Sequence, residues 1–364
     1  MISIPVTTSS RSYEVLIGSG SLAHAGDSLG NLFASRKAFV VTVSPVKKRW
    51  AKVLVESLTA AGIETTLLDM PNGERAKRLS TLEKLSEQLV KAGADRSATL
   101  IAFGGGVVGD VTGFLASIYM RGVDVIQIPT TVLAQVDAAI GGKTGVNLLA
   151  GKNLLGTFHQ PRAVLVDPAV LRTLPAREYR AGLYESLKCG IIGDAGLFKH
   201  FEERHKEILA RDPAAVERVI ADSVRLKASV VSADEREGGL RQVLNLGHTI
   251  GHALEAETGY KLLLHGEAVG WGLVAATYIA LSTGRLDSVT AGRIMNAVLG
   301  LGELPRMRVK TANILKRLKF DKKTRLGVVH FILPREIGKV EITRDVPESA
   351  VRGAVEEMRK LASN

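Results

Sequence analysis

The chain has 364 residues, of which 46% are hydrophobic and 23% are charged, a composition typical of a globular protein rather than a disordered one. Its 48 Lys and Arg residues against 37 Asp and Glu residues give a net charge of +11, which favours phosphates, polyanions or acidic small molecules as ligands. The one cysteine, Cys189, excludes a disulfide framework.

The N-terminal stretch and the apolar runs bear on where the protein resides. Residues 1–20 lack the basic leader and continuous apolar segment of a signal peptide, and we expect them to form a strand. No apolar run approaches the roughly 18 residues of a membrane span. Together with the lone cysteine, which suits a reducing compartment, these features predict a cytoplasmic protein that has no membrane partner.

The basic residues gather mildly at 306–325. Aromatic residues make up only 5% of the chain, and no module rich in stacking side chains recurs. A solvated helix face explains these lysines better than a nucleic-acid surface does, so we expect no nucleic-acid partner.

The first half alternates short β-rich runs with helical patterns. We expect strands at residues 37–43, 63–70, 98–103, 123–128 and 163–167, with helices at 54–62 and 78–93. The last two strands are β-branched and apolar throughout. The alternation predicts an α/β fold with a parallel, Rossmann-like sheet covered on both faces.

From about Arg177 onward the pattern becomes mainly helical. Expected helices include 214–235, 266–284 and 349–362, and a late hairpin is expected from 328–333 and 339–343. We therefore predict an α/β domain over residues 1–180 and a mainly helical domain over residues 181–364.

A glycine-rich turn directly follows the expected strand at 98–103. Gly104, Gly106 and Gly109 satisfy the G-x-G-x-x-G pattern, in which missing Cβ atoms let the backbone approach a pyrophosphate at a helix N-terminus. Tight turns use glycines as well, so a nucleotide site and a plain turn both stay open. No acidic residue ends the next strand where a ribose acceptor usually stands.

Two polar segments lie where a ligand would bind. In residues 72–77, Glu74 is either a ribose acceptor or a helix-start carboxylate stabilised by the helix dipole. Residues 128–153 have the composition of a ligand-contacting loop. There Lys143, Lys152 and Asn153 are candidates for phosphate or carboxylate binding, with Asp137 as a local partner, and solvent-exposed lysines are the alternative.

Two histidines, His248 and His252, lie one helical turn apart. They could chelate one metal, one could bind metal while the other faces a substrate, or the pair could fill a core. Glu185 in the expected helix 181–192 and His265 at the start of the next helix complete a possible zinc centre of one carboxylate and two imidazoles.

Upstream of this pair, residues 234–245 supply Glu237, Arg241 and Asn245. Arg241, Asn245, His248 and His252 recur at steps of four, three and four. If one helix carries them, they share a face that is too polar for a core and should line a cleft.

Taken together, these segments resemble the 3-dehydroquinate synthase family of sugar phosphate cyclases. The resemblance covers most of the chain through the ordered motifs PNGERAK, GGGVVGDVTGFLAS, RGVDVIQIPTTVLAQVDAAIGGKTGVN, GKNLLGTFHQP, AGLYESLKCGII, DEREGGLRQVLNLGHTIGHALE, LLHGEAVGWG and FDKK. It implies a Rossmann-like N-terminal domain, a helical C-terminal domain, and NAD with a divalent metal in the intervening cleft. The metal is usually zinc, with cobalt as the alternative.

The resemblance also implies roles for individual residues. Glu185, His248 and His265 become the metal ligands, and His252 acts near the substrate. For NAD it implies Asn72, Gly73, Glu74, Lys77, Gly105, Gly106, Val107, Val108, Gly109, Asp110, Thr130, Thr131, Lys143 and Lys152. For the substrate it implies Asp137, Lys188, Lys227, Arg241, Asn245 and one of Lys322 and Lys323, with Asn153 and Glu237 as further candidates. Arg121 matches an arginine that reaches the neighbouring subunit's phosphate pocket, which implies a homodimer.

The implied reaction converts 3-deoxy-D-arabino-heptulosonate 7-phosphate to 3-dehydroquinate and phosphate, with NAD reduced and reoxidised in each turnover. Three alternatives stay open on the residues alone: another sugar phosphate cyclase, a metal-dependent alcohol dehydrogenase of the glycerol dehydrogenase type, and a non-catalytic metabolite-binding protein. The pairing of Arg241 with Lys227 favours a substrate that carries a carboxylate.

Overall fold

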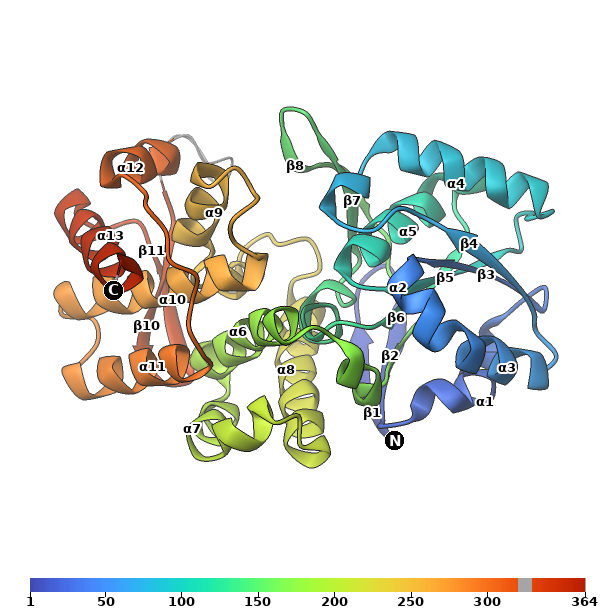
Figure 1. Cartoon of the computed structure of the whole chain (residues 1–364), viewed down its shortest axis with the longest axis horizontal. Helices are drawn as coiled ribbons and strands as arrows, with labels where there is room; N and C mark the ends of the chain where they lie inside the picture. Colours follow the sequence, from blue (N-terminus) through green and yellow to red (C-terminus); the bar gives the residue numbers. More distant parts are fainter. Residues whose placement is uncertain (320–328, 364) are drawn as a thin grey trace. The chain divides into compact units, whose positions relative to one another are not determined.

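A computed structural model describes residues 1–319 and 329–363 of the chain (Figure 1). The contacts of the chain divide it into two compact units. The first consists of Met1–Leu174 and Val216–Arg236, and the second of Pro175–Ala215 and Glu237–Asn364. The segment Val216–Arg236 returns to the first unit, and the domain boundary near residue 180 stays a prediction. None of the described helices has both the length and the apolar character that crossing a membrane requires.

A seven-stranded sheet in the order β1-β2-β9-β6-β5-β3-β4 forms the centre of the first unit. Its strands are β1 (Ile2–Thr7), β2 (Ser12–Ile17), β3 (Lys37–Thr42), β4 (Glu64–Asp69), β5 (Thr99–Gly104), β6 (Asp124–Pro129) and β9 (Ala163–Val166). Only the β1–β2 pair is antiparallel. The predicted parallel sheet is therefore confirmed. The N-terminal stretch is a hairpin rather than the single expected strand, because residues 8–11 form a tight turn.

Helices cover both faces of this sheet. The helices of the first unit are α1 (Ala25–Leu29), α2 (Ser44–Val46), α3 (Lys52–Ala60), α4 (Leu79–Lys91), α5 (Gly106–Ile118) and most of α8 (Pro213–Ala233). Leu85 of α4 and Val111 of α5 pack into one core, whereas Leu54 of α3 packs into the core on the opposite face. Because both faces are covered, the central parallel strand β5 is buried along its whole length, whereas β4, at the edge of the sheet, is buried at Leu68 alone.

The glycine- and lysine-rich segment that we expected to be a loop is ordered instead. It forms a short π-helix, Ala134–Ala138, followed by an antiparallel hairpin of β7 (Lys143–Leu148) and β8 (Gly151–Phe158). In this hairpin Gly145 and Gly156 face each other, and a Cβ on Gly156 would lie 2.0 Å from the carbonyl oxygen of Thr144. The glycines therefore serve the close approach of two strands.

The second unit is mainly helical, as predicted. Its helices are α6 (Ala176–Gly193), α7 (Ala195–Leu209), α9 (His248–Glu257), α10 (His265–Ser282), α11 (Ser288–Gly300), α12 (Thr311–Lys319) and α13 (Glu348–Ser363). The predicted late hairpin is also confirmed, as β10 (Phe331–Glu336) paired with β11 (Lys339–Thr343). In α10, fourteen of eighteen residues are buried, among them Gly266 and Glu267. This helix is the central element of the unit.

Candidate active site

The predicted glycine turn joins β5 to α5. The Cβ that Gly104 lacks would lie 2.5 Å from a methyl carbon of Val108, and that of Gly109 would lie 2.9 Å from Oε1 of Gln127. Within the part of the chain that the structure describes, no side chain caps the N-terminal turn of α5. Its first backbone N–H groups are therefore available for an anion, as a pyrophosphate site requires.

A buried lysine stands beside this turn. Lys77 is 5% exposed, and its Nζ donates hydrogen bonds to Oδ2 of Asp110 and to Oδ1 of Asn153. Burial raises the pKa of Asp110, and the neighbouring Lys77 ammonium opposes this rise. The structure thus brings together three predicted residues from α5, the β7–β8 hairpin and the segment after β4.

Glu74 belongs to the same network through a residue that the sequence did not suggest. Asn147 donates from Nδ2 to Oε1 of Glu74 at 2.7 Å, and its backbone N–H donates to the carbonyl of Lys77 at 2.8 Å. Its Oδ1 accepts from the backbone N–H of Asn153 at 2.8 Å. Asn147 therefore ties the β7–β8 hairpin to Glu74 and Lys77. Glu74 also begins a short helical turn, Glu74–Ala76, so both readings of this carboxylate remain compatible with its position.

The other residues predicted for NAD lie near the carboxyl ends of β5 and β6 or in the hairpin. Thr130 is buried and its backbone N–H donates to Gly104 at 2.9 Å, and Thr131 accepts the backbone N–H of Ala134 at 3.2 Å. Asn72 and Gly73 are exposed. Lys143 is exposed on β7, and Lys152 is half-buried on β8.

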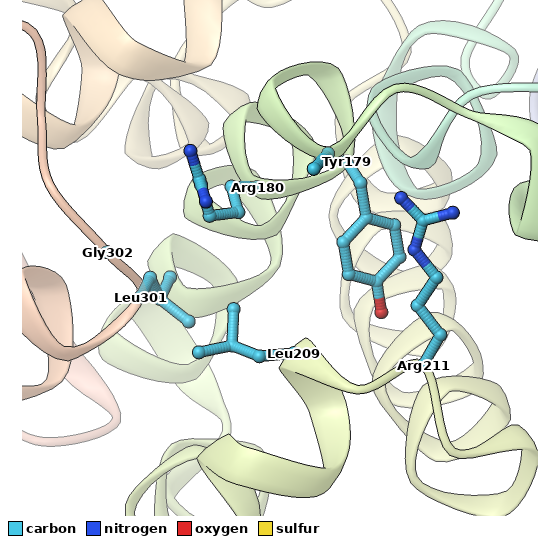
Figure 2. Close-up of a pocket in the computed structure, with 7 residues that line it drawn as sticks. Tyr179, Arg180, Leu209, Arg211, Leu301 and Gly302 are labelled. Carbon is cyan, nitrogen blue, oxygen red and sulfur yellow. The ribbon is translucent and has the colours of Figure 1, made fainter.

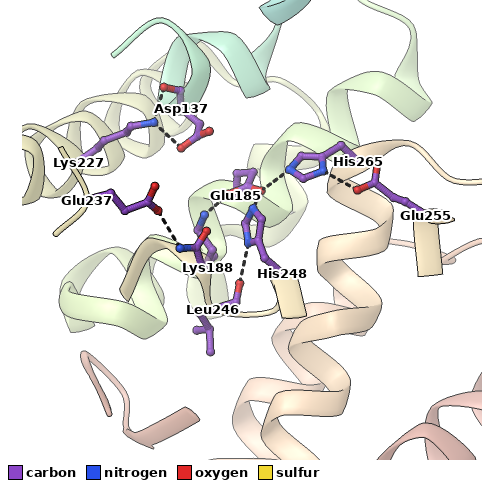
Figure 3. Close-up of polar contacts among 10 residues, drawn as sticks. Asp137, Glu185, Lys188, Lys227, Glu237, Leu246, His248, Glu255 and His265 are labelled. Atoms are coloured by element: carbon purple, nitrogen blue, oxygen red, sulfur yellow. Dashed lines mark hydrogen bonds and ion pairs between the residues drawn. The ribbon is translucent and has the colours of Figure 1, made fainter. Parts of the chain in front are cut away.

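Asp137 and Lys227 form a pair within the first unit. Nζ of Lys227 donates to Oδ1 of Asp137 at 2.6 Å and to the backbone carbonyl of the same residue (Figure 3). Lys227 lies on α8 and its side chain is 7% exposed, whereas that of Asp137 is 33% exposed. The pair therefore presents a carboxylate at the surface with a buried ammonium behind it.

Three helices of the second unit bring together the predicted metal ligands. Oε1 of Glu185, on α6, lies 3.6 Å from Nε2 of His248, on α9, and 3.5 Å from Nε2 of His265, on α10. This Oε1 is buried and accepts no hydrogen bond from the described residues. A tetrahedral zinc ion with bonds of about 2.1 Å separates its ligand atoms by roughly 3.4 Å. The spacing and the orphaned oxygen therefore fit a bound divalent ion.

Neighbouring groups orient each of these ligands (Figure 3). Nδ1 of His248 lies 3.2 Å from the carbonyl oxygen of Leu246, and Nδ1 of His265 lies 3.2 Å from Oε2 of Glu255. Nζ of Lys188 donates to Oε2 of Glu185. In this arrangement both Nε2 atoms and one carboxylate oxygen converge, as they do in a metal site whose outer contacts are satisfied.

The charges of this cluster shift the pKa values of two ligands. Burial alone would raise the pKa of Glu185, but Lys188 and His265 hold it at about 2. Burial likewise would lower the pKa of His265, whereas its contacts with Glu185 and Glu255 raise it to about 10 in the metal-free chain. Glu185 is therefore ionised at neutral pH, as a ligand must be.

The single helix considered for Arg241, Asn245, His248 and His252 is wrong. Arg241 and Asn245 belong to a separate 3-10 turn, Leu240–Asn245, and α9 begins only at His248, after a left-handed Gly247 with φ of 80°. His248 and His252 do share α9, with ring centroids 5.2 Å apart.

The 3-10 turn still contributes polar groups. Arg241 is 2% exposed, and Nδ2 of Asn245 donates to Oε1 of Glu237 at 3.0 Å. The structure therefore buries one of the predicted anion-binding residues and pairs two others of the predicted set.

Two further predictions concern Arg121 and the pair of Lys322 and Lys323. Arg121 is exposed and has φ of 71°, next to Met120 with φ of 50°. Lys322 and Lys323 lie outside the described residues.

A small pocket of about 180 Å³ also lies in the second unit (Figure 2). It is lined by Ala176, Tyr179, Arg180, Leu209, Arg211, Leu301 and Gly302, and the Arg211 guanidinium carbon stands 4.6 Å from the centroid of the Tyr179 ring. None of the predicted site residues lines it. The pocket shares only helix α6 with Glu185.

Comparison with known proteins identifies similar sequences and folds. Residues 67–181 match the family model of the 3-dehydroquinate synthase N-terminal domain, and residues 182–324 match that of the C-terminal domain. A 3-dehydroquinate synthase from Koribacter versatilis is 55% identical over 99% of this chain and 98% of its own length.

Two solved structures are also similar. A 2-epi-5-epi-valiolone synthase from Streptomyces hygroscopicus, with NAD+ and Zn2+ bound, has a TM-score of 0.88 and 30% identity over 96% of this chain and 97% of its own. A 2-deoxy-scyllo-inosose synthase complexed with carbaglucose-6-phosphate, NAD+ and Co2+ has a TM-score of 0.85 and 25% identity over 99% of both chains. Their similarity extends over both units of this chain.

Proposed function

The chain belongs to the 3-dehydroquinate synthase family, and we propose that the groups assembled in its two units carry out that family's reaction. The protein converts 3-deoxy-D-arabino-heptulosonate 7-phosphate to 3-dehydroquinate and phosphate, a step of the shikimate pathway to aromatic amino acids. The observation that carries the residue assignments is the convergence of Glu185, His248 and His265, with an orphaned carboxylate oxygen between two imidazole nitrogens.

The cofactors are NAD and a divalent metal, zinc or cobalt. When bound, NAD would supply a reversible hydride acceptor for the C5 alcohol, and the metal would supply the Lewis acidity that lowers the pKa of that alcohol. We assign the metal to Glu185, His248 and His265. Lys188 holds the second oxygen of Glu185, so the carboxylate keeps one oxygen directed at the two histidines.

We assign NAD to the first unit. The uncapped N-terminus of α5 suits the pyrophosphate, and Glu74 is placed to accept from a ribose hydroxyl while Asn147 holds it. Lys77 and Asp110 order the β7–β8 hairpin beside this turn through Asn153. The remaining residues assigned to NAD are Asn72, Gly73, Gly105, Gly106, Val107, Val108, Gly109, Thr130, Thr131, Lys143 and Lys152.

The substrate carries a carboxylate and a phosphate, so its binding calls for several cations. From the family resemblance we assign it to Lys188, Lys227, Arg241, Asn245 and one of Lys322 and Lys323, and also to Asp137, Asn153 and Glu237. Buried Arg241 can pair two donors with a carboxylate, and Lys227, braced by Asp137, supplies a point charge.

The main role of the protein's residues is to hold the substrate in the conformer that reacts. Once C5 is a ketone, the C6 proton is acidic enough for phosphate to leave by β-elimination, with the phosphate acting as its own base. Once the C5 alcohol is restored, the ring opens and an intramolecular aldol reaction closes the carbocycle. His252 is half-buried one turn from His248, and we assign it to proton transfer near the phosphate.

We further propose a cytoplasmic homodimer. The exposed Arg121, held on a left-handed turn, supports a role at the neighbouring subunit's phosphate pocket, and the lone cysteine fits a reducing compartment. Sedimentation of the wild type and of Arg121→Ala tests the homodimer, and phosphate affinity measured on the same two proteins tests the role of Arg121. A monomeric wild type would contradict the homodimer.

Phosphate release tests the function. Purified protein with the heptulosonate phosphate, a catalytic amount of NAD and zinc should release phosphate and form dehydroquinate in equal amounts. A heptulose phosphate without the carboxylate should react far more slowly. Phosphate release that consumes NAD stoichiometrically, or equal rates with both substrates, would contradict the proposal.

A further inference from the structure

Glu255 is a buried carboxylate that the proposed reaction does not use. It lies on α9 and is 3% exposed. An ionised carboxylate costs several kcal/mol to bury unless polar partners compensate. Oε2 of Glu255 faces Nδ1 of His265 at 3.2 Å, so a proposed metal ligand is among its compensating partners.

The two nitrogens of His265 face opposite ways. Nδ1 faces Glu255, and Nε2 lies 3.5 Å from Oε1 of Glu185. A neutral imidazole has one N–H donor and one lone pair, and a carboxylate can only accept. Glu255 therefore keeps a proton on Nδ1, so the nitrogen that gives up its proton to a metal is Nε2, which faces Glu185 and His248.

We propose that Glu255 is a positioning residue that fixes His265 in the metal-ligating tautomer and thereby sets the metal affinity. This inference rests on the proposed ligand set of the site. The charge of Glu255 acts in the same direction, because it attracts a divalent ion at Nε2 twice as strongly as it attracts a proton competing for the same lone pair.

The other histidine ligand, His248, is oriented by a backbone carbonyl and not by a carboxylate. Nδ1 of His248 faces the backbone carbonyl of Leu246 at 3.2 Å. A carbonyl fixes the tautomer but carries no charge, and no side-chain substitution removes it. Of the two histidine ligands, His265 is therefore the one whose binding strength a mutation of its neighbour can change.

Glu255 could instead bind a metal directly. His252, Glu255 and His265 also have one ligand atom each within 4.8 Å of one another. In that arrangement Glu255 would be a ligand, and its loss would change the coordination of the ion. As a positioning residue, its loss changes the affinity and leaves the coordination as it was.

The variant Glu255→Gln separates these possibilities, because an amide oxygen still accepts from Nδ1 without carrying charge. Glu257→Gln is the matched control, since Glu257 lies on the same helix but pairs with Arg317 at 2.7 Å and Asn313 at 2.6 Å. Metal-free protein is titrated with Zn2+ against a chelating dye, and the absorption spectrum of the Co2+ form is recorded. The exchangeable, paramagnetically shifted N–H signals of the two cobalt-bound histidines are followed by NMR.

We expect Glu255→Gln to weaken Zn2+ binding by about 10–100-fold, as loss of such an outer partner does, and to keep the tetrahedral Co2+ spectrum. One of the two shifted N–H signals should move and exchange faster. Glu257→Gln should bind metal within about twofold of the wild type. Thermal unfolding of both metal-free variants confirms that they are folded.

Two results would overturn the inference: Zn2+ binding by Glu255→Gln as tight as that of the wild type, or a Co2+ spectrum that changes coordination. Glu185→Gln tells this failure apart from failure of the proposed ligand set. If Glu185→Gln binds Zn2+ normally, the ligand set itself is wrong. If it loses the metal while Glu255→Gln does not, only the role of Glu255 is wrong.

Discussion

Gly266 and Ala181 bring the backbones of α10 and α6 into contact. A Cβ on Gly266 would lie 1.8 Å from the carbonyl oxygen of Ala181, closer than any real contact. His265 directly precedes this glycine, and Glu185 lies one turn after Ala181. The contact therefore fixes the separation of two of the three proposed metal ligands.

Gly266→Ala should force the two helices apart. We expect a loss of about 1–3 kcal/mol in the free energy of unfolding, because overpacking against backbone has no flexible side chain to absorb it. Zinc content per chain should fall as well. Urea unfolding and metal analysis measure the two effects.

Gly292→Ala is the control for this substitution. Gly292 is also inside a helix, α11, but a Cβ there would meet nothing within 4 Å. Its replacement should be neutral or stabilise by up to about 1 kcal/mol, the difference in helix propensity. Equal behaviour of the two variants would show that the α6–α10 contact has no such effect.

Replacement of Lys77 should destabilise the protein, because it leaves the carboxylate of Asp110 without its partner. Lys77→Ala leaves Asp110, whose side chain is 22% exposed, without its ammonium, and we expect destabilisation near the lower end of about 3–5 kcal/mol. Adding Asp110→Asn should recover part of that loss. NAD affinity should fall because the β7–β8 hairpin loses its tie through Asn153.

The exposed pair of Lys47 and Asp69 provides the comparison for Lys77. Its side chains are 39% and 57% exposed, so Lys47→Ala should change stability by less than about 1 kcal/mol. Urea unfolding of the wild type, Lys77→Ala, Lys77→Ala with Asp110→Asn, and Lys47→Ala measures whether their stabilities follow this order. If Lys77→Ala were as mild as Lys47→Ala, the network around the glycine turn would not depend on this lysine.

His252→Ala tests the proton-transfer role. Turnover should fall by roughly 100-fold or more, the typical contribution of a general acid or base, while one zinc per chain is retained. Steady-state rates and metal analysis of the same preparation give both numbers. Near-normal turnover with the metal still bound would remove His252 from the mechanism.

The stability of the first unit should depend on pH through Glu235. Burial alone would raise the pKa of Glu235, but hydrogen bonds from Ser10, Ser9 and Gln160 hold it at about 2. A folded pKa below the ordinary value of 4.5 stabilises the protein above pH 4.5, and this stabilisation is lost as the pH falls toward 2.

The variant Glu235→Gln isolates this effect. The difference in the free energy of unfolding between wild type and variant should be largest at neutral pH and shrink between about pH 4.5 and pH 2. Denaturation at several pH values measures it. A difference that does not vary with pH would mean that the charge of Glu235 contributes nothing.

Hydrophobic periodicity predicted most of the fold. Apolar runs such as residues 123–128 identify strands that are buried on both faces, and the spacing of Leu82, Leu85 and Leu89 identifies the buried face of α4. The β7–β8 hairpin was not predicted, because glycines such as Gly145 and Gly156 dominate it and their packing partner is each other's backbone. Composition alone reads such a segment as a loop.

Sequence spacing predicted the relative positions of site residues only where one helix carries them. The four-residue spacing of His248 and His252 places them on one face because both lie within α9, whereas Gly247, with φ of 80°, separates them from Arg241. Glu255 could have been found, because it lies seven residues after His248 and three after His252, on the same helical face. Asn147 gave no such signal, since only the folded hairpin places it beside Glu74.

Helix packing, a backbone carbonyl and two ion pairs hold the ligand set of the second unit in place. Metal binding therefore does not have to drive folding, as it does in small zinc domains. Chelation should leave a folded apoprotein that regains its ion without renaturation, and the ion should raise the melting temperature only to the extent that mass action allows.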